Sequence, residues 1–235
     1  MKSETDISIK ERVKKFYDEQ WGKLTTKEAL DRKINLNSII KPLIEFSGIR
    51  DGDRIVDLGC GTGTLAIAIA ELNKNTKIYG IDISRESLRV AKKIIVDLGL
   101  ENAINLIEAD IDFMPFLDNF FDLVVSQATI NLLPDKMKAF NEISRITRKG
   151  GTIVISDCTS KTKVCGSDEL WNKCITGAPS FDEFVNYASD ANLSLVDYLK
   201  LTDEVRHLVE ENLWHWPEFL EFDMEYFVFK LKKQN

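Results

Sequence analysis

The stretch RIVDLGCGTGTLAIAIAEL, residues 54–72, leads from one apolar run through an aspartate and three alternating glycines into a second apolar run. The short first run is typical of a buried strand, and the longer second run of a helix. Because glycine weakens both strands and helices, Gly59, Gly61 and Gly63 predict a turn where the backbone comes close to a ligand. The free amides at the start of the following helix would face that ligand.

The spacing of this loop narrows the kind of ligand. A dinucleotide loop of the form G-x-G-x-x-G needs glycine at position 64, where the chain has Thr64. A P-loop needs Gly-Lys followed by Ser or Thr, and that sequence is absent here. Asp57, two residues before Gly59, is a candidate site residue, with the capping of a turn as the alternative interpretation.

Bulk composition excludes several classes of function. The 235 residues carry a formal net charge of −7, so we expect no nucleic-acid partner. We find no apolar leader and no run of 18 uncharged apolar residues, which predicts a cytoplasmic protein without a membrane span. The four cysteines (Cys60, Cys158, Cys165 and Cys174) lack zinc-type spacing, so neither a metal site nor a disulfide framework is expected.

The order of elements predicts the fold class. Residues 10–48 favour helix, with a kink or a split at Pro42. Alternating strands and helices follow, and they indicate an α/β, doubly wound sheet. The expected strands are 55–58, 77–81, 104–108, 121–125, 152–156, 193–201 and 226–231; the expected helices are 62–72, 85–98, 134–149 and 180–192, the last opened by a capping box.

Further candidate site residues follow the expected strand ends, where ligands of such sheets bind. The carboxylate of Asp82 can accept hydrogen bonds from the hydroxyls of a ribose, and that of Asp110 can accept one from the amine of adenine. Ile83 and Ile111 could enclose the adenine ring, and Ser126 follows the central strand. Each acid alone could instead begin a helix or lie in a loop, but their shared position favours one site.

Taken together, these segments resemble the class I S-adenosylmethionine-dependent methyltransferases. The resemblance rests on VDLGCGTG (56–63), YGIDIS (79–84), EADIDFMPFLDNFFDLVVS (108–126) and EISRITRKGGTIVISD (142–157). It implies a Rossmann-like seven-stranded sheet, its last strand antiparallel, with an N-terminal helical extension. It also implies that Gly59 and Gly61 line the methionine part of S-adenosylmethionine, that Asp82 binds its ribose and that Asp110 binds its adenine amine.

A closer resemblance is to the arsenite methyltransferases. It rests on VVSQATINLLPDK (124–136) and DELWNKCITGAPSFDEFVNYASDANL (168–193). Cys174 matches one cysteine of that group, whereas Ala128 replaces a second, and no cysteine precedes Cys60 to replace the third. The resemblance implies a small-molecule acceptor, with a thiol or a metalloid among the candidates.

Methyl transfer from a sulfonium needs little acid–base assistance, which fits the lack of a catalytic triad. The candidates for a catalytic role are Asp157, Cys174 and His207, with His215 as a further histidine. At the N-terminus, Tyr17 and Trp21 are predicted to close over the cofactor. The aromatic stretch 211–222 is predicted to lie near the acceptor or an interface, and core packing is the alternative for both segments.

The sequence thus predicts one methyltransferase domain over residues 1–235. Its parts are a helical cap (1–48), a cofactor-binding core (50–160) and a substrate-side segment with the final strands (161–235). The expected function is methyl transfer from S-adenosylmethionine to a small molecule, releasing S-adenosylhomocysteine. The alternatives are a non-catalytic S-adenosylmethionine-binding regulator and an NAD-dependent oxidoreductase, the latter disfavoured by Thr64. Both a monomer and a homodimer are compatible with the sequence.

Overall fold

A computed structural model describes residues 4–73, 75–164, 174–214 and 216–234. Its centre is a seven-stranded sheet in the order β3-β2-β1-β4-β5-β7-β6. The strands are β1 (Arg54–Leu58), β2 (Lys77–Asp82), β3 (Ile104–Glu108), β4 (Phe121–Gln127), β5 (Thr147–Ser160), β6 (Leu193–Lys200) and β7 (Met224–Lys233). The pairs from β3 to β5 are parallel, and β7 runs antiparallel to both β5 and β6. The predicted Rossmann-like sheet with an antiparallel last strand is therefore confirmed.

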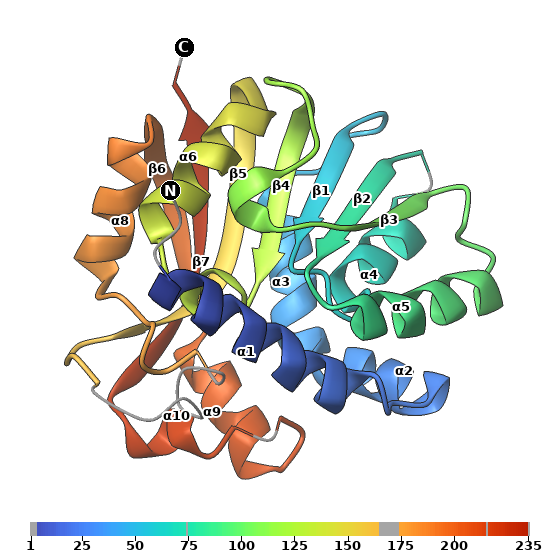
Figure 1. The fold of residues 1–235 in the computed structure, drawn as a ribbon, viewed down its shortest axis with the longest axis horizontal. Coiled ribbons are helices and arrows are strands. Elements are labelled where there is room, and N and C mark those ends of the chain that lie inside the picture. The colour runs from blue at the N-terminus through green and yellow to red at the C-terminus, as the bar shows by residue number, and fades with distance from the viewer. Residues whose placement is uncertain (1–3, 74, 165–173, 215, 235) are drawn as a thin grey trace.

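Helices cover both faces of the sheet (Figure 1). They are α1 (Glu4–Trp21), α2 (Thr26–Asn35), α3 (Asn37–Ser47), α4 (Thr64–Leu72), α5 (Arg85–Asp97), α6 (Lys136–Ile146), α8 (Phe181–Asp190), α9 (Thr202–Glu210) and α10 (Glu218–Glu221), with short 3-10 turns η1 (Ile111–Phe113) and η2 (Ile130–Leu132). Neighbouring residues of β1 alternate between two buried apolar clusters: Ile55 joins the cluster with α3, α4 and α5, and Val56 joins the cluster with α6 and α8. Nearly continuous apolar strands follow from burial on both faces.

The helical N-terminal segment divides differently from the prediction. The helical segment is interrupted between Trp21 and Thr26 and again at Leu36, whereas α3 continues through Pro42. The first break is fixed by a capping box, in which Thr25 and Glu28 satisfy each other's backbone amides at the start of α2. Pro42 therefore does not split the segment.

One predicted helix was too long. The helix expected over residues 134–149 begins after the N-cap Asp135 and ends at Ile146, and β5 begins at Thr147. The amides of Asn119 and Phe120 bond to the carbonyls of Arg145 and Ile146, both at 2.8 Å, which ends the helix and leads the chain into the sheet. The expected strand 152–156 is correspondingly longer at both ends.

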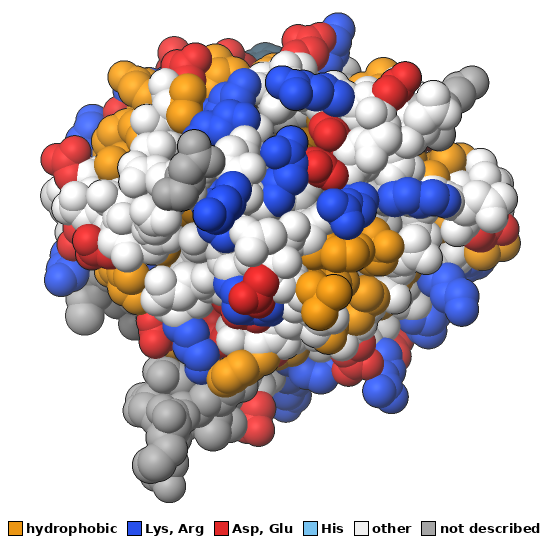
Figure 2. All heavy atoms as spheres, turned by 90° about the horizontal axis from the view of Figure 1, so that it is seen from above, with side chains coloured by type: hydrophobic (Ala, Val, Ile, Leu, Met, Phe, Trp, Pro, Cys, Tyr) orange, Lys and Arg blue, Asp and Glu red, His pale blue; other side chains and the backbone are white. Residues whose placement is uncertain are grey.

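The two ends of the parallel strands differ. Helix α1 runs across their carboxyl ends (Figure 1), and Lys10 and Asp18 of α1 contact the segments after β3 and β2. Lys and Arg side chains gather at the opposite end (Figure 2). There burial lowers the pKa of Lys232, and the positive charges of Lys230, Arg50 and Arg148 lower it further. A site for a small ligand is expected at the carboxyl ends.

Candidate active site

A cavity of about 820 Å³ lies at the carboxyl ends of β1, β2 and β4. Segments from both ends of the chain complete its walls: α1 and α2 from the N-terminal part, and Leu213, Trp214 and Trp216 from the C-terminal part. A cavity of this size and position is where a fold of this kind binds a small molecule. The predicted aromatic stretch after residue 211 therefore reaches the cavity through Leu213, Trp214 and Trp216.

The glycine loop after β1 forms the cavity floor. Gly59 has a φ of 67°, and a Cβ there would lie 2.2 Å from Cγ2 of Thr129, so only glycine fits. A Cβ on Gly61, whose φ is 54°, would meet nothing within 4 Å, which leaves its backbone open to the cavity. Gly63 does not line the cavity; it begins α4 with a φ of 83°. The three glycines thus differ: Gly59 is required by packing, Gly61 leaves its backbone open to the cavity, and Gly63 begins a helix.

Asp57 and Ser126 lie beneath this loop. Asp57 is 1% exposed and lines the cavity; its Oδ2 has no hydrogen-bond partner among the described residues. Burial raises the pKa of Asp57 to about 8, an effect that the amide of Ala66 opposes. Ser126 is fully buried and lies outside the cavity lining, with its Oγ donating to the carbonyl of Leu58 at 3.0 Å. Ser126 therefore ties β4 to β1.

The acids after β2 and β3 come together at one end of the cavity. Asp82 accepts the amide of Ser84 through Oδ1 and that of Gly61 through Oδ2, each at 2.8 Å. Burial raises the pKa of Asp82, while these two backbone bonds lower it. Asp110 lines the same cavity, and its Oδ1 lies 2.5 Å from Nζ of Lys10. The two isoleucines that follow the acids, Ile83 and Ile111, also line it.

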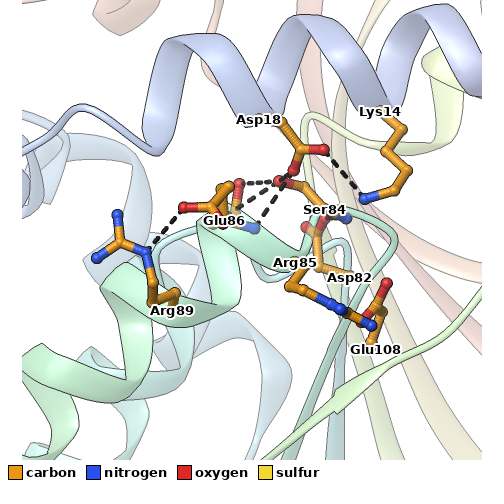
Figure 3. Close-up of polar contacts among 9 residues, drawn as sticks. Lys14, Asp18, Asp82, Ser84, Arg85, Glu86, Arg89 and Glu108 are labelled. Carbon is orange, nitrogen blue, oxygen red and sulfur yellow. Dashed lines mark hydrogen bonds and ion pairs between the residues drawn. The ribbon is translucent and has the colours of Figure 1, made fainter.

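Helix α1 is held to this end by polar contacts that sequence reasoning missed (Figure 3). Ser84 Oγ donates to Asp18 Oδ1 at 2.6 Å, and Lys14 Nζ lies 3.0 Å from Asp18 Oδ2. Lys10 contacts both Asp110 and Asp112. A signal was present, because Lys10, Lys14 and Asp18 are four residues apart and so share one helical face.

Aromatic side chains form a further part of the cavity lining. Tyr17 and Trp21, the predicted lid residues, line the cavity with ring centroids 5.9 Å apart. Trp214 and Trp216 lie across from the sheet with centroids 4.9 Å apart. The guanidinium of Arg32, from α2, stands 4.0 Å from the centre of the Trp21 ring. This part of the lining is thus largely apolar, and the guanidinium of Arg32 lies beside it.

Of the three predicted catalytic candidates, which all lie within the described residues, Cys174 alone lines the cavity. Asp157 is fully buried behind the cavity, where it accepts the amides of Asn131 and Cys158, and burial raises its pKa to about 6. Cys174 does line the cavity, with its Sγ 3.6 Å from the carbonyl oxygen of Ala128. His207 is exposed on α9 and is no part of the lining.

Neither thiols nor a metal cluster dominate the cavity. Cys60 and Cys174 line it, and burial raises the pKa of both thiols well above its usual value, so they stay protonated at neutral pH. The described residues hold no group of three or more His, Cys, Asp or Glu side chains arranged for a metal ion. Cys165 and His215 lie outside the described residues.

The profile of the methyltransferase domain family matches residues 49–212, more than half of the chain. The chain belongs to this family. Its cofactor is S-adenosylmethionine, as the resemblance of the glycine loop implied. The finer grouping with the arsenite methyltransferases stays a prediction.

Curated relatives are similar over the same region. Methyltransferase GfsG of Streptomyces halstedii is 28% identical over 167 residues, which cover 68% of this chain and 59% of that protein. The ubiquinone/menaquinone biosynthesis C-methyltransferase UbiE of Teredinibacter turnerae is 33% identical over 113 residues, 48% of this chain and 45% of that protein. The chain spans about half the length of the curated relatives it matches.

Solved structures show the same fold. The [4+2]-cyclase SpnF superposes with a TM-score of 0.73 at 20% identity, covering 91% of this methyltransferase-family chain and 85% of the other. Geranyl diphosphate C-methyltransferase of Streptomyces coelicolor, in complex with Mg²⁺, geranyl diphosphate and S-adenosylhomocysteine, gives 0.70 at 16% identity, covering 83% and 78%. Within the described residues, no helix is both long and apolar enough to span a bilayer.

Proposed function

We propose that the chain transfers the methyl group of S-adenosylmethionine to an apolar organic small molecule. The observation that carries this proposal is one cavity whose lining combines two chemically different sets of residues. One set is the open glycine backbone and the carboxylates, which suit a nucleoside, and the other is a group of aromatic side chains, which suits an apolar acceptor.

The carboxylates and the glycine backbone of the cavity fit the cofactor. Asp82 would accept the ribose hydroxyls, since its carboxylate is held by two backbone amides and lines the cavity. Asp110 would accept the adenine amine, with Ile83 and Ile111 on the faces of the ring. The open backbone at Gly61 would take the methionine part.

When bound, S-adenosylmethionine would supply a methyl group on a sulfonium. An electron pair of the acceptor, a lone pair or the π electrons of a ring carbon, would form the new bond to the methyl carbon as the bond to sulfur breaks, and the acceptor's proton would pass to water. The chain's own task is to align the two molecules and exclude water. Tyr17 and Trp21 would do so from α1, and Trp214 and Trp216 from the C-terminal part. This mechanism requires none of the predicted catalytic candidates to act as a base.

The cavity supports an organic acceptor better than a metalloid. A trivalent arsenic needs several thiolates, whereas the two lining thiols are held protonated and Ala128 lies beside Cys174. UbiE is named a C-methyltransferase of ubiquinone and menaquinone biosynthesis, which supports carbon among the acceptor atoms.

The test is a labelled-methyl transfer assay on a panel of hydroquinones, phenols, amines, thiols and arsenite. We expect labelled product from a ring-bearing organic acceptor and none from arsenite. Transfer to arsenite would show the acceptor class to be wrong. Binding of S-adenosylhomocysteine without transfer to any acceptor would instead favour the non-catalytic regulator.

A further inference from the structure

Beside the aromatic side chains of the cavity lies a cation, Arg32, that the proposed function does not use. Its side chain extends from α2 into the lining, with Cζ 4.0 Å from the Trp21 ring centre. A cation over a tryptophan face is attracted by the ring quadrupole, and in the described part of the chain no hydrogen-bond acceptor engages the guanidinium as well.

No carboxylate in the described ranges lies within ion-pair distance of Arg32. Glu28, one helical turn earlier and also in the lining, accepts the amide and the hydroxyl of Thr25 at 2.8 and 2.7 Å. Asp31 lines the cavity but is exposed to solvent. Asp110 is held by Lys10, and Asp82 is held by backbone amides. Nearby acids are therefore engaged elsewhere or face water.

The phenol of Tyr17 does not balance this charge either. Burial raises the pKa of Tyr17 well above its usual value, so the phenol is neutral at physiological pH. Burial also lowers the pKa of Arg32, which shows that its surroundings penalise the charge. A guanidinium nevertheless stays protonated in proteins, and a desolvated cation calls for an anion.

We propose that Arg32 binds an oxyanion carried by the methyl acceptor, a carboxylate or a phosphate monoester. A planar guanidinium can donate two parallel hydrogen bonds to either group. The aromatic wall would hold the apolar body of the same molecule. This inference rests on the proposed function and narrows its acceptor to an apolar molecule with an anionic substituent.

The test compares ligands that differ only in charge. Binding of 2-naphthoate, 2-naphthyl phosphate and neutral 2-naphthamide is measured by calorimetry on the full chain saturated with S-adenosylhomocysteine. We expect one of the anions to bind at least about tenfold more tightly than the amide, in line with a charge-assisted hydrogen-bonded pair. Whichever of 2-naphthoate and 2-naphthyl phosphate binds more tightly identifies the oxyanion as a carboxylate or a phosphate.

Arg32→Gln should reduce that preference to about twofold or less while S-adenosylhomocysteine affinity is kept. Lys27→Gln is the matched control, since it removes a charge from an exposed position of α2 outside the lining. Equal binding of amide and anions, no binding of either anion, or a preference retained in Arg32→Gln would each overturn the inference. Failure of the proposed function is distinct: S-adenosylhomocysteine would not bind, or no acceptor would be methylated.

Discussion

Asp57, near the carboxyl end of β1, has a pKa that is changed by its burial. Its carboxyl is buried with one oxygen unpaired, and burial raises its pKa to about 8. An unfolded aspartate has a pKa of about 3.9, so the folded state holds a proton that the unfolded chain releases between about pH 4 and pH 8. The free energy of unfolding should therefore fall as the pH rises through this window.

Asp57→Asn should flatten that fall, because asparagine does not titrate. The wild type loses up to ~1.4 kcal/mol per pH unit through this one group, and the variant loses less over the same range. Urea unfolding at pH 5, 6, 7 and 8 measures both slopes. Asp97→Asn, at an exposed position of α5, is the control and should keep the wild-type slope. Parallel profiles for Asp57→Asn and wild type would contradict the assignment.

Asp82 is the residue on which cofactor affinity should depend most directly. Asp82→Asn replaces one of the two acceptor oxygens by a donor, which would face the amide of Gly61 or that of Ser84 and remove one acceptor for the ribose. We expect at least about tenfold weaker binding of S-adenosylhomocysteine by calorimetry, the loss of roughly one charged hydrogen bond. Asp97→Asn again serves as control, and an unchanged affinity in Asp82→Asn would remove this residue from the site.

Strand-end residues could be predicted from sequence, whereas their partners could not. Asp57, Asp82 and Asp110 follow apolar runs, so their positions depend only on local pattern and on the shared edge of a parallel sheet. Lys10 contacts Asp110 across 100 residues, and Arg32 enters the cavity through the orientation of α2. Those placements depend on how helices pack against the sheet, which local pattern does not specify.

At the scale of elements, α1 is joined to the core by a small set of polar contacts. Burial raises the pKa of Asp18, but hydrogen bonds from Ser84, Lys14 and the amide of Glu86 outweigh it and lower the pKa below its usual value. A lowered pKa means that the contact stabilises the fold above the pKa of the unfolded group and is lost as the pH falls through the folded pKa. Attachment of α1 should thus weaken in acid.

Asp18→Ala should loosen α1 at neutral pH. Hydrogen exchange is expected to speed up over residues 8–21 and S-adenosylhomocysteine to bind more weakly, because Tyr17 and Trp21 lie on this helix. Mass-spectrometric hydrogen exchange measures the first effect and calorimetry the second. Glu19→Ala, one position along and exposed, should change neither; an equal effect of both variants would contradict a specific role for Asp18.

Element ends were harder to predict than element types. The capping box at Ser180 marks the start of α8 correctly, because its hydrogen bonds join residues three apart. The end of α6 was misplaced because the amides of residues 119 and 120, distant in sequence, take its last carbonyls. Gly150, which directly follows the predicted end of that helix, lies within β5 with a φ of 66°.

For the whole molecule, ligand-induced stabilisation separates the methyltransferase from the oxidoreductase alternative. S-Adenosylhomocysteine at 100 times its Kd should stabilise the folded chain by about 2.7 kcal/mol. NAD at the same concentration should give no shift, because Thr64 replaces the third glycine of a dinucleotide loop. Thermal unfolding with each ligand measures this, with adenosine as a control for the nucleoside part. A shift with NAD alone would contradict the cofactor assignment.

The placement of β7 between β5 and β6 also sets an order of assembly during synthesis. In the sheet, β6 is bonded only to β7, which is made some 25 residues later in the chain. While β7 is still in the ribosomal exit tunnel, β6 would have no strand partner, whereas β1 to β5 could already pair among themselves. An unpaired strand edge on a nascent chain is prone to association with other chains. The C-terminal half of the sheet is therefore where a translating ribosome would need a chaperone most.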